Sequence, residues 1–340
     1  MNAVIRAVVR KGIFHYNDTF VGFLEGWRGV LEDQWIDLDL KAVAGILPRG
    51  GTVLRTSRTN PAKREGGIAQ CMDNLAKHKL DTLICIGGDD TQSVAMKLHQ
   101  QGVNVVGVPK TIDNDLGGTD YCFGFDTAVN IATEAIDRVH TTAEAHNRVM
   151  VVEVMGRDSG WIAIYSGIAG GADVILVPER PFDLDEVAET LKRRHERGRY
   201  FSIVVVAEGA KLSASAGHQF ESRLDEFGHV RLGGIGNVVA TEIERRTGYE
   251  ARSVVLGHIQ RGGSPTAFDR MLATRYGVGA IDMVHRREFG YMVALQGTEI
   301  VSVPLQKALQ RTRVVPPELL EVANSLQDRR GSKHTVLASN

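Results

Sequence analysis

The chain has 340 residues, enough for two domains or one large α/β domain, and 43% of them are hydrophobic, an ordinary share for a globular protein. Its 40 Lys and Arg residues balance 41 Asp and Glu residues, so no net field attracts nucleic acid or an anionic membrane. The sequence shows no bilayer-length apolar stretch and no signal peptide, so we expect a cytoplasmic protein whose cysteines, Cys71, Cys85 and Cys122, are reduced and mostly buried.

Short apolar segments alternate with amphipathic segments along most of the chain. The patterns predict helices over residues 1–10, 68–79, 91–101, 127–146 and 237–247. They predict strands over residues 83–86, 103–108, 149–154, 174–177 and 203–207. Such regular alternation predicts a parallel α/β architecture. Residues 209–231 are rich in Ser, Gly and mixed charge and are expected to form a surface excursion, and residues 327–340 a mobile tail.

Two polar runs follow neighbouring predicted strands. The first is Gly87-Gly88-Asp89-Asp90-Thr91, and the second is Pro109-Lys110-Thr111-Ile112-Asp113-Asn114-Asp115. Either run alone is compatible with a solvated turn, but ligands of open α/β sheets bind beyond the carboxyl ends of the strands, so both should face one crevice. Glycines let backbone N–H groups approach an anion, and carboxylates can hold Mg²⁺ or accept a proton. The mixture predicts phosphoryl transfer.

Two further motifs add cations. The segment Val152-Glu153-Val154-Met155-Gly156-Arg157 places an arginine at the end of a third strand, although alone it equally describes an arginine at the rim of a helix. In Leu256-Gly257-His258-Ile259-Gln260-Arg261-Gly262-Gly263, a histidine and an arginine lie among glycines. Such a pair predicts a small cationic pocket suited to a phosphomonoester.

Together with Met1-Asn2-Ala3-Val4-Ile5-Arg6, these four motifs resemble the 6-phosphofructokinase family, from Met1 to about Ile281. The resemblance implies two three-layer α/β/α domains with mostly parallel sheets around a central cleft. It implies a phosphoryl-donor domain of residues 1–124 with about 260–311, and a sugar-phosphate domain of about 125–259 with about 312–326. It also implies a reaction of glycolysis that uses Mg²⁺.

The resemblance also assigns roles to single residues. Asp113 matches the base that deprotonates the sugar 1-hydroxyl, and Arg157 and Arg58 match cations that stabilise the transferring phosphoryl group. The implied substrate contacts are Thr111, Asp115, Met155, Gly156 and Glu208, with His258 and Arg261 at the 6-phosphate. The implied donor contacts are Gly87, Gly88, Asp89, Asp90 and Lys110, with Mg²⁺ on Asp89 and Asp115. Arg148 and Arg252 match arginines donated across a subunit interface, which implies a homodimer or homotetramer with shared active sites.

Asp90 and Lys110 bear on the phosphoryl donor. In the ATP-using members of the family that this chain resembles, both positions look like Gly, which leaves room for the inner phosphate of the nucleotide. A carboxylate at Asp90 should disfavour ATP by bulk and like charge, and Lys110 supplies a compensating cation. The pair resembles pyrophosphate-dependent members and predicts a reversible transfer from pyrophosphate to fructose 6-phosphate. The alternatives are the same reaction from ATP, since some members with this Lys use ATP, and a non-catalytic sugar-phosphate-binding paralogue.

The chain departs from the family at its start. Members usually open with a strand and a Gly-Gly-Asp loop just before Met-Asn-Ala, whereas this sequence begins at that Met. We expect Met1 to be an internal methionine of a longer protein, because the catalytic residues are otherwise intact. The alternative, a true loss of the loop, would leave a sheet edge unpaired and the donor pocket without its glycines.

Overall fold

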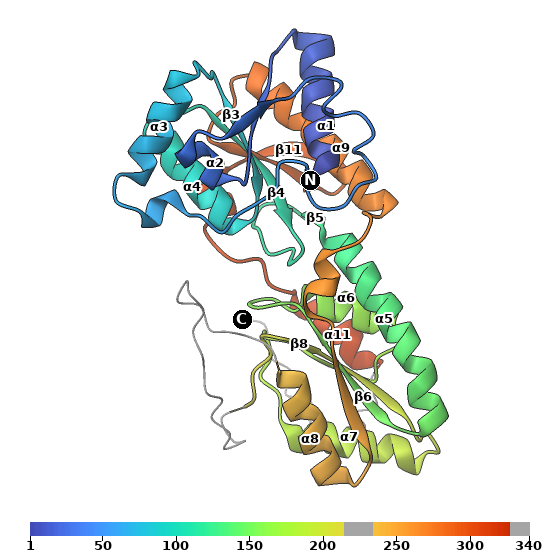
Figure 1. The fold of residues 1–340 in the computed structure, drawn as a ribbon. Coiled ribbons are helices and arrows are strands. Elements are labelled where there is room, and N and C mark those ends of the chain that lie inside the picture. The colour runs from blue at the N-terminus through green and yellow to red at the C-terminus, as the bar shows by residue number, and fades with distance from the viewer. Residues whose placement is uncertain (214–233, 327–340) are drawn as a thin grey trace. The chain divides into compact units, whose positions relative to one another are not determined.

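The computed structural model describes residues 1–213 and 234–326, and the described chain divides into two compact units (Figure 1). Unit 1 consists of Met1–Ala128 and Arg261–Arg313. Unit 2 consists of Val129–Gln260 and the chain from Val314 onward, as far as these are described. The predicted tail, residues 327–340, and residues 214–231 of the predicted excursion lie outside the described residues.

Unit 1 is built around a mixed sheet in the order β11-β10-β4-β3, with β5 beside β4. Strands β3 and β4 are parallel, β10 is parallel to β4, and β11 pairs antiparallel with β10. A separate antiparallel pair joins β1 to β2. The strands are β1 (Val21–Phe23), β2 (Trp35–Asp37), β3 (Leu83–Gly87), β4 (Val105–Thr111), β5 (Phe123–Gly124), β10 (Tyr291–Gln296) and β11 (Glu299–Pro304). The helices are α1 (Asn2–Lys11), the π-helix η1 (Gly12–Tyr16), α2 (Trp27–Glu32), η2 (Pro61–Lys63), α3 (Gly67–Lys77), α4 (Asp89–Gln100), α9 (Ala267–His285) and α10 (Leu305–Ala308).

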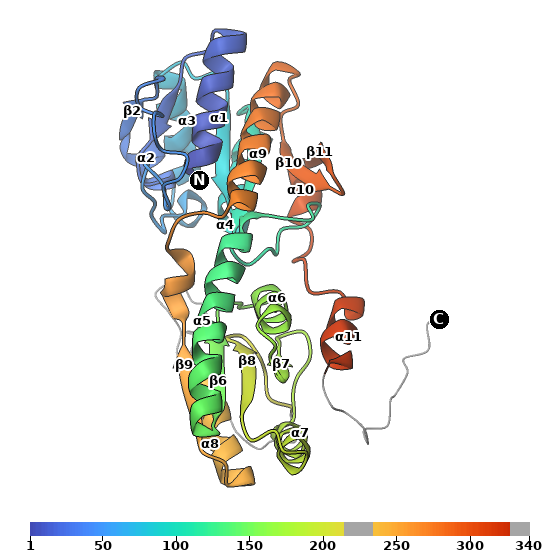
Figure 2. The same ribbon diagram turned by 90° about the vertical axis from the view of Figure 1, so that its right-hand side faces the viewer.

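Helices cover both faces of the unit 1 sheet. Helices α1 and α9 pack side by side on one face (Figures 1 and 2). The pleat turns successive side chains to opposite faces, so Val106 joins the core under α1 and α9, whereas Val105 joins the core under α3 and α4. This burial on both sides explains why the strands read as continuous apolar runs.

Unit 2 contains an all-parallel sheet in the order β7-β8-β6-β9. Its strands are β6 (Val149–Val154), β7 (Val174–Leu176), β8 (Ser202–Ala207) and β9 (Ala251–Val255). Its helices are α6 (Trp161–Ala169), α7 (Leu184–Glu196), α8 (Ile235–Thr247) and α11 (Pro317–Ser325). Helix α5 (Phe125–His146) begins in unit 1 and continues in unit 2, and the 3₁₀ helix η4 (Gly257–Arg261) leads from unit 2 back to unit 1.

Helices α7 and α8 cover one face of the unit 2 sheet, where Val151 and Val204 pack against Val187 and Val239. Alternation along the strand turns Val152 to the other face, and it too is fully buried. Helix α6 packs on the sheet through β7 and β8 (Figure 2). The predicted α/β class with mostly parallel sheets is therefore confirmed.

The predicted elements are confirmed with shifted ends. The strand predicted from residue 103 starts at Val105 and extends to Thr111, and the helix predicted from residue 91 starts two residues earlier, at Asp89. All three cysteines are buried and free, as predicted. Within the described residues, no helix is both long enough and apolar enough to cross a membrane.

Candidate active site

The two polar runs meet at the carboxyl ends of β3 and β4. These strands pair in parallel, with Gly87 opposite Pro109. A methyl group placed on Gly88 would lie 3.5 Å from the carbonyl oxygen of Lys110 and 3.6 Å from Cβ of Thr111. The structure thus brings the glycine-rich turn beside the start of the Thr111–Asp115 segment, as adjacent strands require.

Asp89 and Asp90 occupy the first turn of α4 rather than a preceding loop. Gly88 is the N-cap of this helix. The free N–H groups and the positive end of the helix dipole favour acidic side chains in the first turn. Partial burial and then the charge of Asp90 raise the pKa of Asp89. A cation or a phosphate-bound metal ion at this turn would relieve that repulsion.

The segment after β4 forms a tight polar turn. The Asp113 amide donates to Oγ1 of Thr111 at 3.0 Å. Asn114 is almost fully buried with φ of +54°, and its side-chain oxygen accepts from the Cys122 amide at 2.8 Å. Positive φ is uncommon for non-glycine residues, although Asn adopts it more readily than most. The turn that carries Asp113 and Asp115 is therefore held by one bond within the segment and one from Cys122 outside it.

Lys110 lies at the end of β4 with two charges acting on it. Burial and then the charge of Arg261 lower the pKa of Lys110, while Asp113 opposes this shift. Lys110, Arg261 and Asp113 thus belong to one electrostatic cluster in unit 1. Such a cluster is suited to an anionic ligand, whose charge would favour the ammonium form of the lysine.

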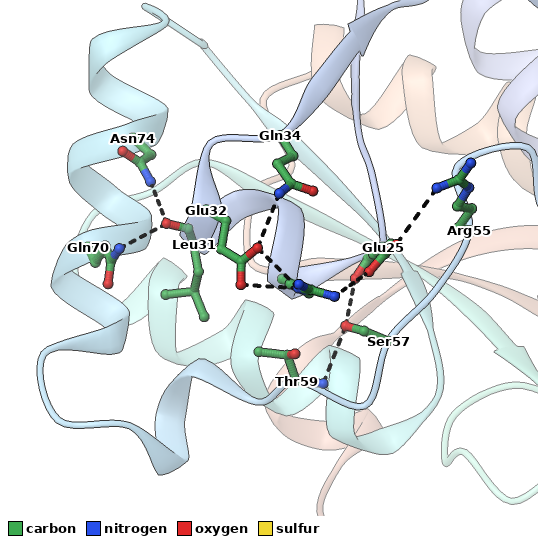
Figure 3. A network of polar contacts seen from close by, with 10 residues as sticks. Glu25, Leu31, Glu32, Gln34, Arg55, Ser57, Thr59, Gln70 and Asn74 are labelled. Carbon is green, nitrogen blue, oxygen red and sulfur yellow. Dashed lines mark hydrogen bonds and ion pairs between the residues drawn. The ribbon is translucent and has the colours of Figure 1, made fainter.

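Arg58 is exposed. Its neighbour Ser57 is tied to the segment just before α2 (Figure 3). The Ser57 hydroxyl donates to the Glu25 carbonyl at 2.7 Å, and the Thr59 amide donates to that hydroxyl at 3.3 Å. Arg28 bridges the carboxylates of Glu25 and Glu32 at 3.0 Å each. Ser57 is therefore held by the backbone of Glu25, two residues before α2, and Thr59 is held by Ser57, while Arg58 itself is exposed.

In unit 2, Met155, Gly156 and Arg157 follow β6 directly and lie beside Glu208, which follows β8. The Glu208 amide donates to the Val154 carbonyl at 2.8 Å, and the Gly209 amide donates to the Gly156 carbonyl at 3.0 Å. Gly156 has φ of +138°, which favours glycine, and a side chain on Gly209 would overlap the Arg157 carbonyl. The segments that follow β6 and β8 thus pack directly against each other, with no space for a side chain at Gly209.

His258 and Arg261 are three residues apart in η4. Side chains at that spacing in a 3₁₀ helix project from the same side, and both are exposed. Between them, the buried Gln260 accepts from the Met155 amide at 3.3 Å and donates to the Gly257 carbonyl at 3.2 Å. Gln260 therefore ties η4 to the end of β6.

Arg148 and Arg252 lie at the other end of the unit 2 sheet from Met155 and Glu208. Arg148 precedes β6 and Arg252 is near the start of β9. Both form ion pairs with Glu250, at 2.8 Å and 2.6 Å, and the hydrogen bond from Arg148 is the main reason why the pKa of Glu250 is lowered. The structure does not bring these two arginines to the other predicted residues of their own unit.

Comparisons with known proteins now decide the family. The sequence pattern of the phosphofructokinase family matches residues 1–284. This chain belongs to the phosphofructokinase family. It is 59% identical, over 94% of both chains, to the pyrophosphate–fructose 6-phosphate 1-phosphotransferase of Streptomyces coelicolor. It is 51% identical, over 93% of both chains, to the ATP-dependent 6-phosphofructokinase 3 of the same organism. It also resembles the solved T-state structure of Pichia pastoris phosphofructokinase, with a TM-score of 0.81, 31% identity, and coverage of 96% of this chain and 35% of that one.

Sequence reasoning missed three residues that hold segments bearing the candidate site residues in place. They are Gln92, Gly209 and Gln260. Gln92 is fully buried in α4 and donates to the carbonyls of Gly87 and Val108 at 3.1 Å and 3.0 Å, so it fastens the two strands that carry the polar runs. A buried glutamine among apolar helix positions is the signal that could have found it.

Proposed function

We propose that this chain transfers a phosphoryl group from pyrophosphate to fructose 6-phosphate, giving fructose 1,6-bisphosphate and phosphate. The observation that carries the proposal is the junction of Gly88 with Lys110 and Thr111, which sets the turn bearing Asp90 beside the segment bearing Asp113. Close backbone approach at a glycine, free helix N–H groups and a cation suit a diphosphate. The high identity to an enzyme of that name supports the same assignment.

Each residue then has a separate role in the transfer. The sugar 1-hydroxyl oxygen attacks the terminal phosphorus of pyrophosphate, its proton passes to Asp113, and the bridging P–O bond breaks to release phosphate. Arg58 and Arg157 stabilise the charge on the transferring group. Unit 1 serves as the donor domain with Gly87, Gly88, Asp89, Asp90 and Lys110, and unit 2 holds the sugar with Met155, Gly156 and Glu208. Thr111, Asp115, His258 and Arg261 complete the substrate contacts.

Mg²⁺ fits this set of residues. Among the described residues, no group of three or more His, Cys, Asp and Glu side chains is placed to hold a metal ion. Magnesium in phosphoryl-transfer sites takes only one or two carboxylates and fills its remaining positions with phosphate oxygens and water. Burial and then the charge of Asp90 raise the pKa of Asp89. A divalent cation there would counter both effects, because it favours the ionised carboxylate. Asp89 and Asp115 would hold it with the pyrophosphate, and it would neutralise developing charge.

Self-association completes the proposal. Arg148 and Arg252 lie at the opposite end of the unit 2 sheet from Met155 and Glu208, each paired with Glu250. Placed there, they can serve another copy of the chain rather than their own sugar site. We therefore propose a homo-oligomer in which these two arginines reach the substrate of a neighbouring subunit.

The alternative donor is ATP, and one specific observation favours it: a relative at 51% identity is an ATP-dependent enzyme. The test is one assay series with fructose 6-phosphate and Mg²⁺ that compares pyrophosphate with ATP, with fructose 1,6-bisphosphate plus phosphate for the reverse direction. We expect a clear preference for pyrophosphate in kcat/KM. A preference for ATP would reassign the donor, and inactivity with both, in a protein that still binds fructose 6-phosphate, would support the non-catalytic alternative.

A further inference from the structure

Arg313 holds the backbone of the Asp113–Asp115 turn at two points. Its Nη1 donates to the Asn114 carbonyl at 3.1 Å, and its own amide donates to the Asp115 carbonyl at 2.7 Å. Arg313 is the last residue of unit 1 before the chain passes to unit 2, and nearly two hundred positions separate it from this turn. Its contact with the turn is therefore a product of the fold and not of local sequence.

The part of the turn that Arg313 holds is also the part with unusual backbone geometry. Asn114 has φ of +54° and is almost fully buried. The buried thiol of Cys122 has a raised pKa, first because of burial and then because of the charge of Asp115, whereas Arg313 acts in the opposite direction. Cation and carboxylate thus lie close enough to Cys122 for both charges to act on it. Asn adopts positive φ more readily than most residues, and a charged donor on the Asn114 carbonyl favours this conformation further.

Two residues later, the same segment is fastened in unit 2. The Val315 amide donates to Oε1 of Glu179 at 3.0 Å. The two oxygens of Glu179 also accept from the Gly160 amide at 2.9 Å and 3.1 Å. Gly160 is the N-cap of α6 and ends the short loop that carries Arg157. A methyl group on Gly160 would lie 2.5 Å from Val177, so this loop end has little freedom.

We propose that Arg313 is a positioning residue for the Asp113–Asp115 turn, and that the segment Arg313–Val315 couples this turn to the Arg157 loop. The proposal rests on the function proposed above, in which Asp113 takes the proton and Arg157 stabilises the phosphoryl group. Two residues of chain span at most about 7 Å, so the two attachments cannot separate further than this without one of them breaking. Small misplacements of catalytic groups lower turnover strongly.

The first experiment replaces Arg313 in the full-length protein. Arg313→Met keeps the aliphatic length but removes the donors and the charge, and Arg313→Lys keeps a cationic donor. Arg311→Met is the matched control, because Arg311 is an exposed arginine two residues earlier. We expect kcat of Arg313→Met to fall by about 10- to 100-fold, with KM for fructose 6-phosphate and the melting temperature nearly unchanged. Arg313→Lys should recover most of the loss, and Arg311→Met should behave as wild type.

Amide hydrogen exchange tests the same proposal without activity. In Arg313→Met the amides of residues 112–116 should exchange faster than in wild type, and those of residues 156–160 should follow. Unchanged exchange in both segments, or a loss of kcat that only parallels a loss of melting temperature, would overturn the positioning role. Two outcomes can be told apart. If the wild-type protein is inactive with both donors but the amides of Arg313→Met still exchange faster, the proposed function is refuted and the structural role of Arg313 stands.

A double-mutant cycle tests the coupling. Glu179→Ala removes the acceptor in unit 2, and the double variant combines it with Arg313→Met. Independent sites give effects on kcat that multiply, whereas coupled sites deviate from the product by at least about twofold. Multiplicative effects would overturn the coupling through Arg313–Val315.

Discussion

The amide of Asp113 donates to the hydroxyl oxygen of Thr111, two residues back, at 3.0 Å. This bond closes the turn at the end of β4 that carries the carboxyl group we assign as the base. Asp113→Asn keeps the size and polarity of the side chain but cannot accept the proton. We expect kcat to fall by about 10²–10⁴-fold with substrate binding retained. A folded variant that keeps a tenth of the activity would exclude Asp113 as the base.

The choice of donor should respond to Asp90. Asp90→Gly removes a carboxylate from the first turn of α4, where the inner phosphate of ATP would pass. We expect relative specificity to shift toward ATP by about 10- to 200-fold, the usual size of a local pocket change. Lys110→Gly is the comparison variant and should weaken pyrophosphate use without creating good ATP use. The measurement is kcat/KM with both donors. Efficient ATP use by the wild-type protein, unchanged in Asp90→Gly, would contradict the proposal that Asp90 excludes ATP.

The lowered pKa of Lys110 predicts a pH dependence. Burial and the charge of Arg261 disfavour its ammonium form, so it loses its proton at a lower pH than an exposed lysine. Pyrophosphate kcat/KM, which reports the free enzyme, should therefore decline as pH rises toward the ordinary lysine value of about 10.4. Between the lowered pKa of Lys110 in the folded protein and its ordinary value, the unfolded chain binds more protons than the folded one. The free energy of unfolding should therefore rise with pH in that range.

The matched variant for that profile is Lys110→Arg, whose guanidinium keeps its charge. Its alkaline limb should lie at higher pH than that of wild type. The ratio of the two profiles removes the titration of pyrophosphate itself. If kcat/KM of both proteins declines at the same alkaline pH, a group other than Lys110 causes the decline.

Two adjacent glycines should behave differently when a methyl group is added. In Gly87→Ala the methyl group would overlap the side chain of Thr91, whereas in Gly88→Ala it would meet only ordinary contacts at 3.5 Å and 3.6 Å. We expect Gly87→Ala to lose about 1–3 kcal/mol of stability, as overpacking does. Gly88→Ala should keep its stability yet raise KM for the donor, because the backbone is less accessible. Chemical denaturation and steady-state kinetics separate the two effects.

Shared active sites can be tested by mixing chains. Asp113→Ala and Arg252→Ala should each be inactive alone. Hybrid oligomers of the two should regain activity, because one subunit can supply an intact base and the other an intact arginine. Hybrids that demonstrably form, shown by tagged purification, but remain inactive would refute donation across the interface.

Much of the fold was predictable because both sheets are buried on both faces, so strands such as Val149–Val154 are apolar except for a single residue, Glu153. The start of α4 was predicted two residues late, because acidic residues resemble a loop in sequence but are favoured in a first helical turn. The sequence analysis proposed neither β10 nor β11. The contacts that Gln260 makes with Met155 and Arg313 with Asn114 join distant parts of the chain, so no local pattern could reveal them.

The discontinuity of unit 1 bears on the order in which the protein folds during synthesis. Strand β10 pairs with β4 and α9 packs on α1, yet both follow residue 260. The four strands of the unit 2 sheet are complete by Val255. A nascent chain emerging from the ribosome can therefore pair all of the unit 2 strands while one edge of β4 still lacks its partner. That open edge is the surface a ribosome-associated chaperone would have to shield.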